Sequence, residues 1–257
     1  MTSSSKSTTK KSAKGSTKVV NPNSSGGKGF LWAILALLLV GALVIGLIVY
    51  NGRGAIADRI AENVEPVDGV NMELADNTVT LSGENSDGAK EASLYEDFGC
   101  HYCGVLAKKT DEQMLEKIKA GELKVHIHPM TFRDGTGERY EAGHSTNTLA
   151  ATLALVDKGE VEPYWNLRKA LLEEQESLAG VTPDQLADMA KSVGASKGAV
   201  EAIRKSEYMD QAKELGEANE KSLVDKTGEL SSPRVLVDGK DVESNPLENW
   251  IDDLLAS

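Results

Sequence analysis

Cysteine is nearly absent from this chain. Only two of its 257 residues are cysteines, Cys100 and Cys103, and they lie three positions apart. No other cysteine is present to form a structural disulfide elsewhere. This excludes the small secreted scaffolds that several separated disulfides hold together. The whole thiol content of the protein therefore belongs to one local Cys-x-x-Cys motif.

Acidic residues are absent from residues 1–29, and basic residues are scarce in the rest of the chain. The first 29 residues hold six lysines and too few apolar side chains to offset the entropy of ordering, so we expect a disordered tail. Without these six, 22 of the 28 Lys and Arg remain against 40 Asp and Glu, a net charge of −18. A nucleic-acid partner is excluded, because a phosphate backbone demands a basic face.

Residues 30–50 contain no charged side chain. A helix of this length rises ~1.5 Å per residue and spans the ~30 Å hydrocarbon core of a membrane. Trp32 and Tyr50 lie near its ends, where aromatic rings favour the headgroup zone. The lysine-rich flank predicts a cytoplasmic N-terminus and an extracytoplasmic remainder, anchored in the cell membrane by a single pass. A cleaved signal peptide is the alternative, since residues 55–57 resemble a cleavage site, but the apolar run exceeds the ~7–15 residues of a signal core.

An α/β domain is predicted over residues 76–257, after a juxtamembrane segment over 51–75. Alternation of apolar residues predicts short strands, and a 3.6-residue period predicts helices, including one long helix over 197–223. A strand–helix–strand start implies a partly parallel sheet that helices must cover. The predicted strands cover residues 78–81, 92–98, 123–128 and 235–237, and the first helix of the domain covers 103–120.

The motif Cys100-His101-Tyr102-Cys103 lies between a predicted strand and a predicted helix. Unpaired N–H groups and the macrodipole at a helix N-terminus stabilise an anion, so Cys100 is predicted to be an exposed nucleophile with a lowered thiol pKa. Cys103 is close enough to attack a mixed disulfide formed at Cys100, which is typical of repeated thiol-disulfide exchange. His101, if protonated, would stabilise the thiolate further; the alternative is an exposed polar spacer.

A second candidate element is the segment 231–235, Ser-Ser-Pro-Arg-Val, in which proline enters a predicted strand through a small polar residue. We expect a cis peptide bond before Pro233. Placed against the cysteine motif, that bond would leave the backbone of Ser232 free to pair with an extended substrate, as in strand addition.

Residues 96–103, EDFGCHYC, resemble the strand-to-active-site junction of the DsbA-like branch of the thioredoxin superfamily. Residues 232–240, SPRVLVDGK, resemble that family's cis-proline strand and hairpin. The interval between these two segments is too long for plain thioredoxin and is similar to the DsbA-like helical insertion, here at about 138–224. The resemblance covers roughly residues 76–257, and the layout is similar to membrane-anchored members in Gram-positive bacteria. It implies a thioredoxin fold with a helical insertion, preceded by one transmembrane helix.

The resemblance also implies an activity, protein thiol-disulfide oxidoreduction. Cys100 would be the attacking thiol, Cys103 the resolving thiol and Pro233 the cis-proline, with no metal or organic cofactor besides the redox-active disulfide. Members mostly oxidise newly exported, unfolded proteins, and a quinone-linked membrane partner restores the disulfide; some members reduce or isomerise instead. The residues that would line the substrate groove by analogy are Tyr102, Ser232 and Arg234.

Three positions depart from the family pattern. The dipeptide between the cysteines is His-Tyr where members often have proline first, and this leaves the redox direction open. Position 94 is Leu, where many relatives carry an acidic residue. Glu96 or Asp97 could serve as the proton acceptor instead; the alternative is that each is a solvated charge at the end of a strand.

Two other function classes remain open from the residues alone. A Cys-x-x-Cys pair can be half of a zinc or copper site, but a tetrahedral metal needs two more ligands. A non-catalytic tethered scaffold with a vestigial motif is the other class, and the joint presence of both cysteines and the proline element disfavours it. The histidines that a metal could recruit are His101, His126, His128 and His144.

Overall fold

The computed structural model describes the backbone of residues 27–257, and leaves the side chains of residues 27–30 and 45–54 undescribed. The chain divides into two compact units, residues 1–50 and 51–257. The predicted disordered tail, residues 1–29, lies outside the described residues except for its last three.

Helix α1, Gly27–Ala61, includes the predicted membrane span at residues 30–50. Within the part of the chain that the structure describes, no helix is both long enough and apolar enough to cross a membrane. The side chains of residues 45–50 lie outside that part. Large apolar side chains that α1 exposes include Leu31, Trp32, Leu37, Leu38, Leu39, Val40 and Leu43.

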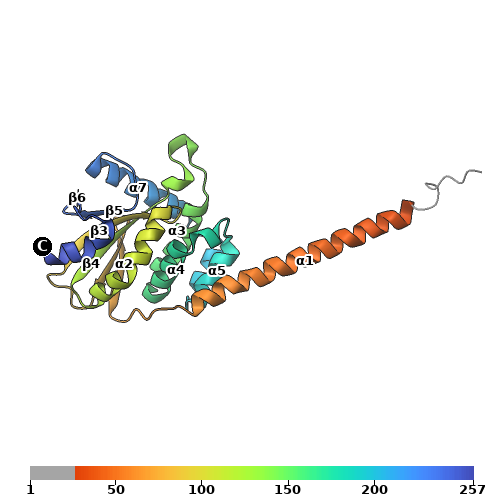
Figure 1. The fold of residues 1–257 in the computed structure, drawn as a ribbon, viewed down its shortest axis with the longest axis horizontal. Helices are drawn as coiled ribbons and strands as arrows, with labels where there is room; N and C mark the ends of the chain where they lie inside the picture. Colours follow the sequence, from red (N-terminus) through yellow and green to blue (C-terminus); the bar gives the residue numbers. More distant parts are fainter. Residues whose placement is uncertain (1–26) are drawn as a thin grey trace, which may run out of the picture. The chain divides into compact units, whose positions relative to one another are not determined.

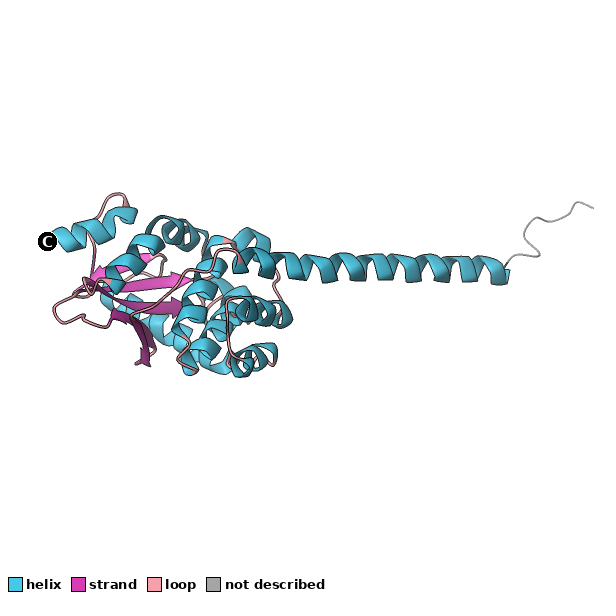
Figure 2. Ribbon diagram, turned by 90° about the horizontal axis from the view of Figure 1, so that it is seen from below, coloured by secondary structure: helices cyan, strands magenta, loops and turns pink. Residues whose placement is uncertain are grey.

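The second unit is built around one six-stranded sheet with the order β1-β2-β4-β3-β5-β6 (Figures 1 and 2). β3 and β4 pair in parallel, and every other neighbouring pair is antiparallel. The first strand lies inside the segment 51–75 that the sequence predicts to be juxtamembrane, so the sheet begins earlier than expected. The strands are β1 Val70–Ala75, β2 Thr78–Gly83, β3 Lys90–Asp97, β4 Leu123–Met130, β5 Arg234–Val237 and β6 Lys240–Asp241.

Seven further α-helices follow in the described chain. The prediction of one helix over residues 197–223 is wrong. α6 ends at Arg204 and α7 begins at Met209, because the chain turns through Ser206 with φ of 55°. The helices are α2 His101–Lys119, α3 His144–Asp157, α4 Val161–Glu173, α5 Pro183–Ser192, α6 Lys197–Arg204, α7 Met209–Thr227 and α8 Trp250–Ala256, with 3-10 turns η1 Phe132–Asp134, η2 Gly137–Arg139, η3 Gln175–Leu178 and η4 Leu247–Asn249.

Successive residues of β3 point to opposite faces of the sheet, and different helices cover the two faces. Leu94 lies beside Leu106 and Ala107 of α2. The next residue, Tyr95, contacts α7 instead, where its hydroxyl is 3.3 Å from Ser222 Oγ. α2 and α7 therefore enclose the centre of the sheet between them.

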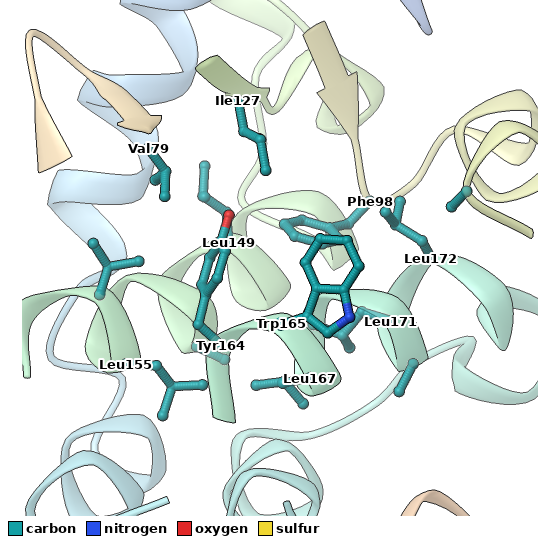
Figure 3. Close-up of a cluster of buried hydrophobic side chains, with 14 of the residues drawn as sticks. Val79, Phe98, Ile127, Leu149, Leu155, Tyr164, Trp165, Leu167, Leu171 and Leu172 are labelled. Carbon is teal, nitrogen blue, oxygen red and sulfur yellow. The ribbon is translucent and has the colours of Figure 1, made fainter. Parts of the chain in front are cut away.

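The main core forms where the sheet meets α3 and α4 (Figure 3). Phe98, just beyond the end of β3, lies beside the indole of Trp165, and both are buried. Burying side chains of this size contributes ~1.5–3 kcal/mol each, before the entropy of ordering is subtracted. This packing fixes the point at which the chain leaves β3 for the cysteine motif.

Candidate active site

The cysteine motif begins where β3 gives way to α2. Cys100 is the N-cap residue of α2, with extended backbone angles of φ −89° and ψ 113°. Its N–H donates to Asp97 O at 2.9 Å, and its own carbonyl accepts from Cys103 N at 3.0 Å. No side chain caps this helix end. The first turn of α2 therefore offers its free N–H groups to whatever the Cys100 side chain carries.

Both cysteines are free thiols, and both are buried. Cys100 is 7% exposed and Cys103 is 3% exposed, so the prediction that Cys100 is an exposed residue is wrong. The reason is a loop far away in sequence, since Ser232 O lies 3.3 Å from Cys100 Sγ and accepts its hydrogen bond. On the inner side, Asp97 N donates to Cys103 Sγ at 3.5 Å.

The two thiols have opposite electrostatic environments. A hydrogen bond from the Cys103 thiol lowers the pKa of Cys100 to about 5, aided by the N–H groups of Cys103 and Tyr102, against the opposing effect of burial. Burial raises the pKa of the Cys103 thiol well above its usual range, and the neighbouring Cys100 thiolate raises it further. At neutral pH the first sulfur is an anion and the second keeps its proton.

The loop that covers Cys100 contains a cis Ser232–Pro233 peptide bond. It leads into β5, whose residues Arg234, Val235 and Leu236 pair antiparallel with β3. This pairing brings the loop to the end of β3 where the cysteines lie. The Ser232 hydroxyl is buried and has no hydrogen-bond partner within the described part of the chain.

The other predicted site residues occupy different positions around the motif. His101 and Tyr102 are exposed, with their rings edge to face at a centroid distance of 5.6 Å. Tyr102 is 69% exposed and so is free to contact another molecule. Arg234, in contrast, is held within the hairpin, where its Nε donates to Asp241 Oδ1 at 2.6 Å. A second nitrogen of its guanidinium donates to Ser231 Oγ at 3.0 Å.

Glu96 and Asp97 are both fully buried, so the interpretation of solvated strand-end charges is wrong. Arg168 of α4 binds both oxygens of Glu96, at 2.7 and 2.6 Å, and also Asp111 of α2 at 2.7 Å. Burial raises the pKa of Asp111 to about 6, although Arg168 opposes the shift. This ion cluster joins the sheet, the cysteine helix and the insertion. Its members line a small void together with Cys103 and Pro233.

Sequence reasoning missed Arg168 and Asp111, and it also missed Gln175. The Gln175 amide, at the start of η3, donates to Phe98 O at 2.8 Å and to Cys100 O at 2.9 Å. Nothing in the local sequence indicates that these residues meet the motif, because each is separated from its partner by tens of positions in the chain.

The four histidines do not converge. His126 lies 3.0 Å from Glu91 Oε2, while His128 stacks on Tyr95 at a ring-centroid distance of 4.3 Å. His144 begins α3. Among the described residues, no group of three or more His, Cys, Asp or Glu side chains is placed to hold a metal ion.

Comparisons with known proteins agree with this geometry. A family model described as thioredoxin matches residues 82–254. The chain is similar to the solved structure of the MdbA protein, a thiol-disulfide oxidoreductase from Corynebacterium matruchotii. The identity is 35% and the TM-score 0.72, with 78% of this chain and 98% of that chain covered.

The corresponding MdbA protein from Corynebacterium diphtheriae is 34% identical with a TM-score of 0.71, and the match covers 76% of this chain and 98% of that one. BdbD from Bacillus subtilis shares the fold at 16% identity and a TM-score of 0.55, covering 73% and 95%. A search of curated protein sequences finds no match. With the family match over residues 82–254 and two solved relatives above 30% identity, the chain belongs to the thioredoxin superfamily, in its DsbA-like branch.

Proposed function

We propose that this protein is an extracytoplasmic thiol-disulfide oxidoreductase that introduces disulfides into exported, unfolded proteins. One observation carries the proposal: the opposed pKa shifts of Cys100, lowered to about 5, and Cys103, raised well above its usual range. Such a pair has one sulfur suited to be attacked and to leave as a thiolate, and a second that holds a proton. The relatives named as thiol-disulfide oxidoreductases support the same reaction class.

The proposed reaction uses only the two cysteines as redox groups. A substrate thiolate attacks Cys100 Sγ of the Cys100–Cys103 disulfide, and the electron pair of the broken S–S bond goes to Cys103 Sγ, which takes up a proton. A second substrate thiolate then attacks the substrate sulfur of the mixed disulfide, and Cys100 leaves as its thiolate. The substrate has lost two electrons and gained a disulfide, and the protein is reduced. No metal or organic cofactor enters these steps.

The oxidising direction follows from the stability of the Cys100 thiolate. A stabilised thiolate favours the reduced protein, which makes its disulfide a strong oxidant. Equilibration with glutathione at known ratios measures the reduction potential. A value near ~−120 mV supports oxidation of substrates, whereas a value near ~−270 mV assigns the protein to the reductases instead.

Mixed disulfides test the roles of the two sulfurs. Cys103→Ser removes the resolving thiol, so we expect adducts with exported proteins to accumulate through Cys100. Cys100→Ser is the matched control and should trap none, because Cys103 is buried. An oxidised protein that fails to oxidise a reduced test protein, together with the absence of adducts, rejects the function.

Substrate contact is proposed at the exposed side chains next to Cys100. Tyr102 is 69% exposed and Val105 43%, so both offer apolar area to an unfolded chain. The cis-proline loop contributes the backbone of Ser232, whose carbonyl accepts a hydrogen bond from Cys100 when that thiol is protonated. We propose that a substrate strand pairs there, as strand addition predicts. Arg234 takes part through the hairpin that it stabilises.

We also propose a single-pass membrane anchor over residues 30–50, with the N-terminus cytoplasmic. The uncharged run and the lysine-rich flank support it. Turnover requires an external oxidant for the reduced pair, and we propose a quinone-linked membrane protein in that role. Accessibility of an introduced cysteine at either end of the run to a membrane-impermeant thiol reagent tests the orientation. Labelling of the domain end only from the cytosol rejects it.

A further inference from the structure

The buried carboxylate of Asp97 lies at the end of β3, three residues before the first cysteine, and it binds three separate segments. Its Oδ1 accepts from Gly99 N at 2.7 Å and from Ser145 Oγ of α3 at 2.5 Å. Its Oδ2 accepts from Arg133 N of η1 at 3.0 Å. One side chain therefore joins the turn before Cys100 to two elements from beyond β4.

The backbone of the same residue contacts both sides of the redox pair. Asp97 O accepts from Cys100 N at 2.9 Å, and Asp97 N donates to Cys103 Sγ at 3.5 Å. Any movement of Asp97 is thus transmitted to both cysteines.

The turn leaves no space for adjustment. A Cβ added to Gly99 would lie 2.6 Å from Ser145 Oγ and 3.1 Å from Arg133 Cβ, so any larger residue would displace the Ser145 hydroxyl that binds Asp97. Ser145 is itself fixed, because its N–H donates to Asp134 Oδ1 at 3.1 Å. The hydrogen bonds of Asp97 therefore connect the turn to a rigid support.

We propose that Asp97 is a positioning residue for the redox reaction, whose carboxylate clamps the Phe98–Gly99 turn against α3 and η1. The clamp holds Cys100 Sγ over the first N–H groups of α2 and Cys103 Sγ against the β3 backbone. This inference rests on the proposed function and adds a role for the insertion, which supplies Ser145. This positioning role depends on the hydrogen bonds of the carboxyl group and is separate from any proton transfer by it.

Two effects of Asp97 on Cys100 have opposite signs, and this makes the proposal testable. Burial raises the pKa of the Asp97 carboxyl to about 7, against the hydrogen bonds that it accepts from Ser145, Arg133 and Gly99. Above that pH the ionised Asp97 disfavours the Cys100 thiolate, so its neutralisation by Asp97→Asn would by itself lower the thiol pKa. As a clamp, Asp97 keeps the sulfur at the helix N-terminus, so its loss raises the thiol pKa. Asparagine also presents an NH₂ group toward the Arg133 or Gly99 donor, which breaks at least one of the ties.

The experiment measures thiolate absorbance at 240 nm against pH in the full-length reduced protein. For Asp97→Asn we expect the Cys100 midpoint to rise by roughly one pH unit, with the equilibrium against glutathione shifting about tenfold toward the disulfide form of this protein. Ser145→Ala removes one of the hydrogen bonds of Asp97 and keeps its carboxyl group, so it should shift both quantities in the same direction by less. The matched control is Asp188→Asn, which removes a half-exposed carboxylate of α5 that pairs with Arg204 and contacts neither the turn nor its support, so it should leave the midpoint unchanged.

Folding is checked by circular dichroism in each case, and Ser145→Ala carries the test if Asp97→Asn does not fold. A lowered or unchanged midpoint in both folded variants overturns the proposal, as does an equal shift in Asp188→Asn. The wild-type midpoint separates this outcome from failure of the proposed function. If the wild-type Cys100 ionises no more readily than free cysteine, the proposed function is rejected. If the wild-type pKa is lowered but the variants show no shift, only the positioning role of Asp97 is rejected.

Discussion

The region built from the sheet, α2 and the cis-proline loop differs from the helical insertion in what each contributes to the site. The first region supplies both cysteine sulfurs and, among the described residues, the backbone groups that hydrogen-bond to them. The insertion contains no cysteine, yet it supplies groups that hold the first region in place. These groups are Ser145, Arg168 and Gln175.

The groups that react therefore lie in the first region, and groups that hold them in position lie in the insertion. The low thiol pKa of Cys100 arises from groups of Cys103 and Tyr102, within three positions of it. The position of that helix end relative to the loop depends on long-range hydrogen bonds and on a buried ion cluster. Changes in the first region should therefore abolish exchange, while changes in the insertion should weaken stability or shift the redox properties.

The largest effect is expected for Cys100→Ser. Thiol-disulfide exchange with a reduced test protein should fall to the uncatalysed rate, because a hydroxyl forms no disulfide, while circular dichroism still reports the native fold. Exchange rates are read from refolding of the test protein. Residual catalysis in this variant would show that Cys103 can act as the nucleophile and would contradict the separate roles of the two thiols.

Arg168→Met should cause the largest loss of stability. It leaves Glu96 and Asp111 buried without their partner, and breaking a buried ion pair in this way costs ~3–5 kcal/mol of unfolding free energy. Urea unfolding measures it. The control is Arg234→Met, which breaks a partly exposed pair with Asp241 and should cost at most ~1 kcal/mol. Equal losses of unfolding free energy in the two variants would show that burial does not make the Arg168 ion cluster more important for stability than the Arg234 pair.

The pH dependence of stability should separate the reduced from the oxidised protein. The pKa of Cys100 is lowered to about 5 in the folded reduced state, so its contribution to stability is complete above the unfolded thiol pKa and is lost as pH falls through about 5. The oxidised protein has no thiol to ionise. The difference in unfolding free energy, reduced minus oxidised, should rise from pH 5 to about pH 8, below the range in which the raised pKa of Cys103 opposes it. Buried carboxyls titrate in both forms, so a flat difference in urea unfolding would contradict the shift.

Gln175→Ala should give the smallest effect of the set. It leaves the carbonyls of Phe98 and Cys100 without their amide donor, at a cost of ~1 kcal/mol in urea unfolding. Gln113→Ala, on the exposed face of α2, is the control and should change stability by less than ~0.5 kcal/mol. An unchanged unfolding free energy for Gln175→Ala would mean that water replaces the amide as the donor to these two carbonyls.

Local patterns predicted much of the fold. The strand before the motif, the helix after it and the Asp238-Gly239 hairpin all appear close to the predicted positions. β1 was missed, because its alternation follows a segment taken as juxtamembrane. The division of α6 from α7 was missed as well, because Ser206 adopts a left-handed conformation without a glycine or proline signal.

By itself, the sequence determined that the redox chemistry belongs to one Cys-x-x-Cys motif at the start of a helix, since a macrodipole and free N–H groups follow from local backbone alone. Only the tertiary structure decided how Cys100 is covered, which charges are buried and what holds the turn. Those features join Ser232, Arg168 and Ser145 to partners at least 48 positions away. Such contacts depend on how complete helices and strands pack, because the residues that flank a side chain in the sequence do not indicate its distant partner.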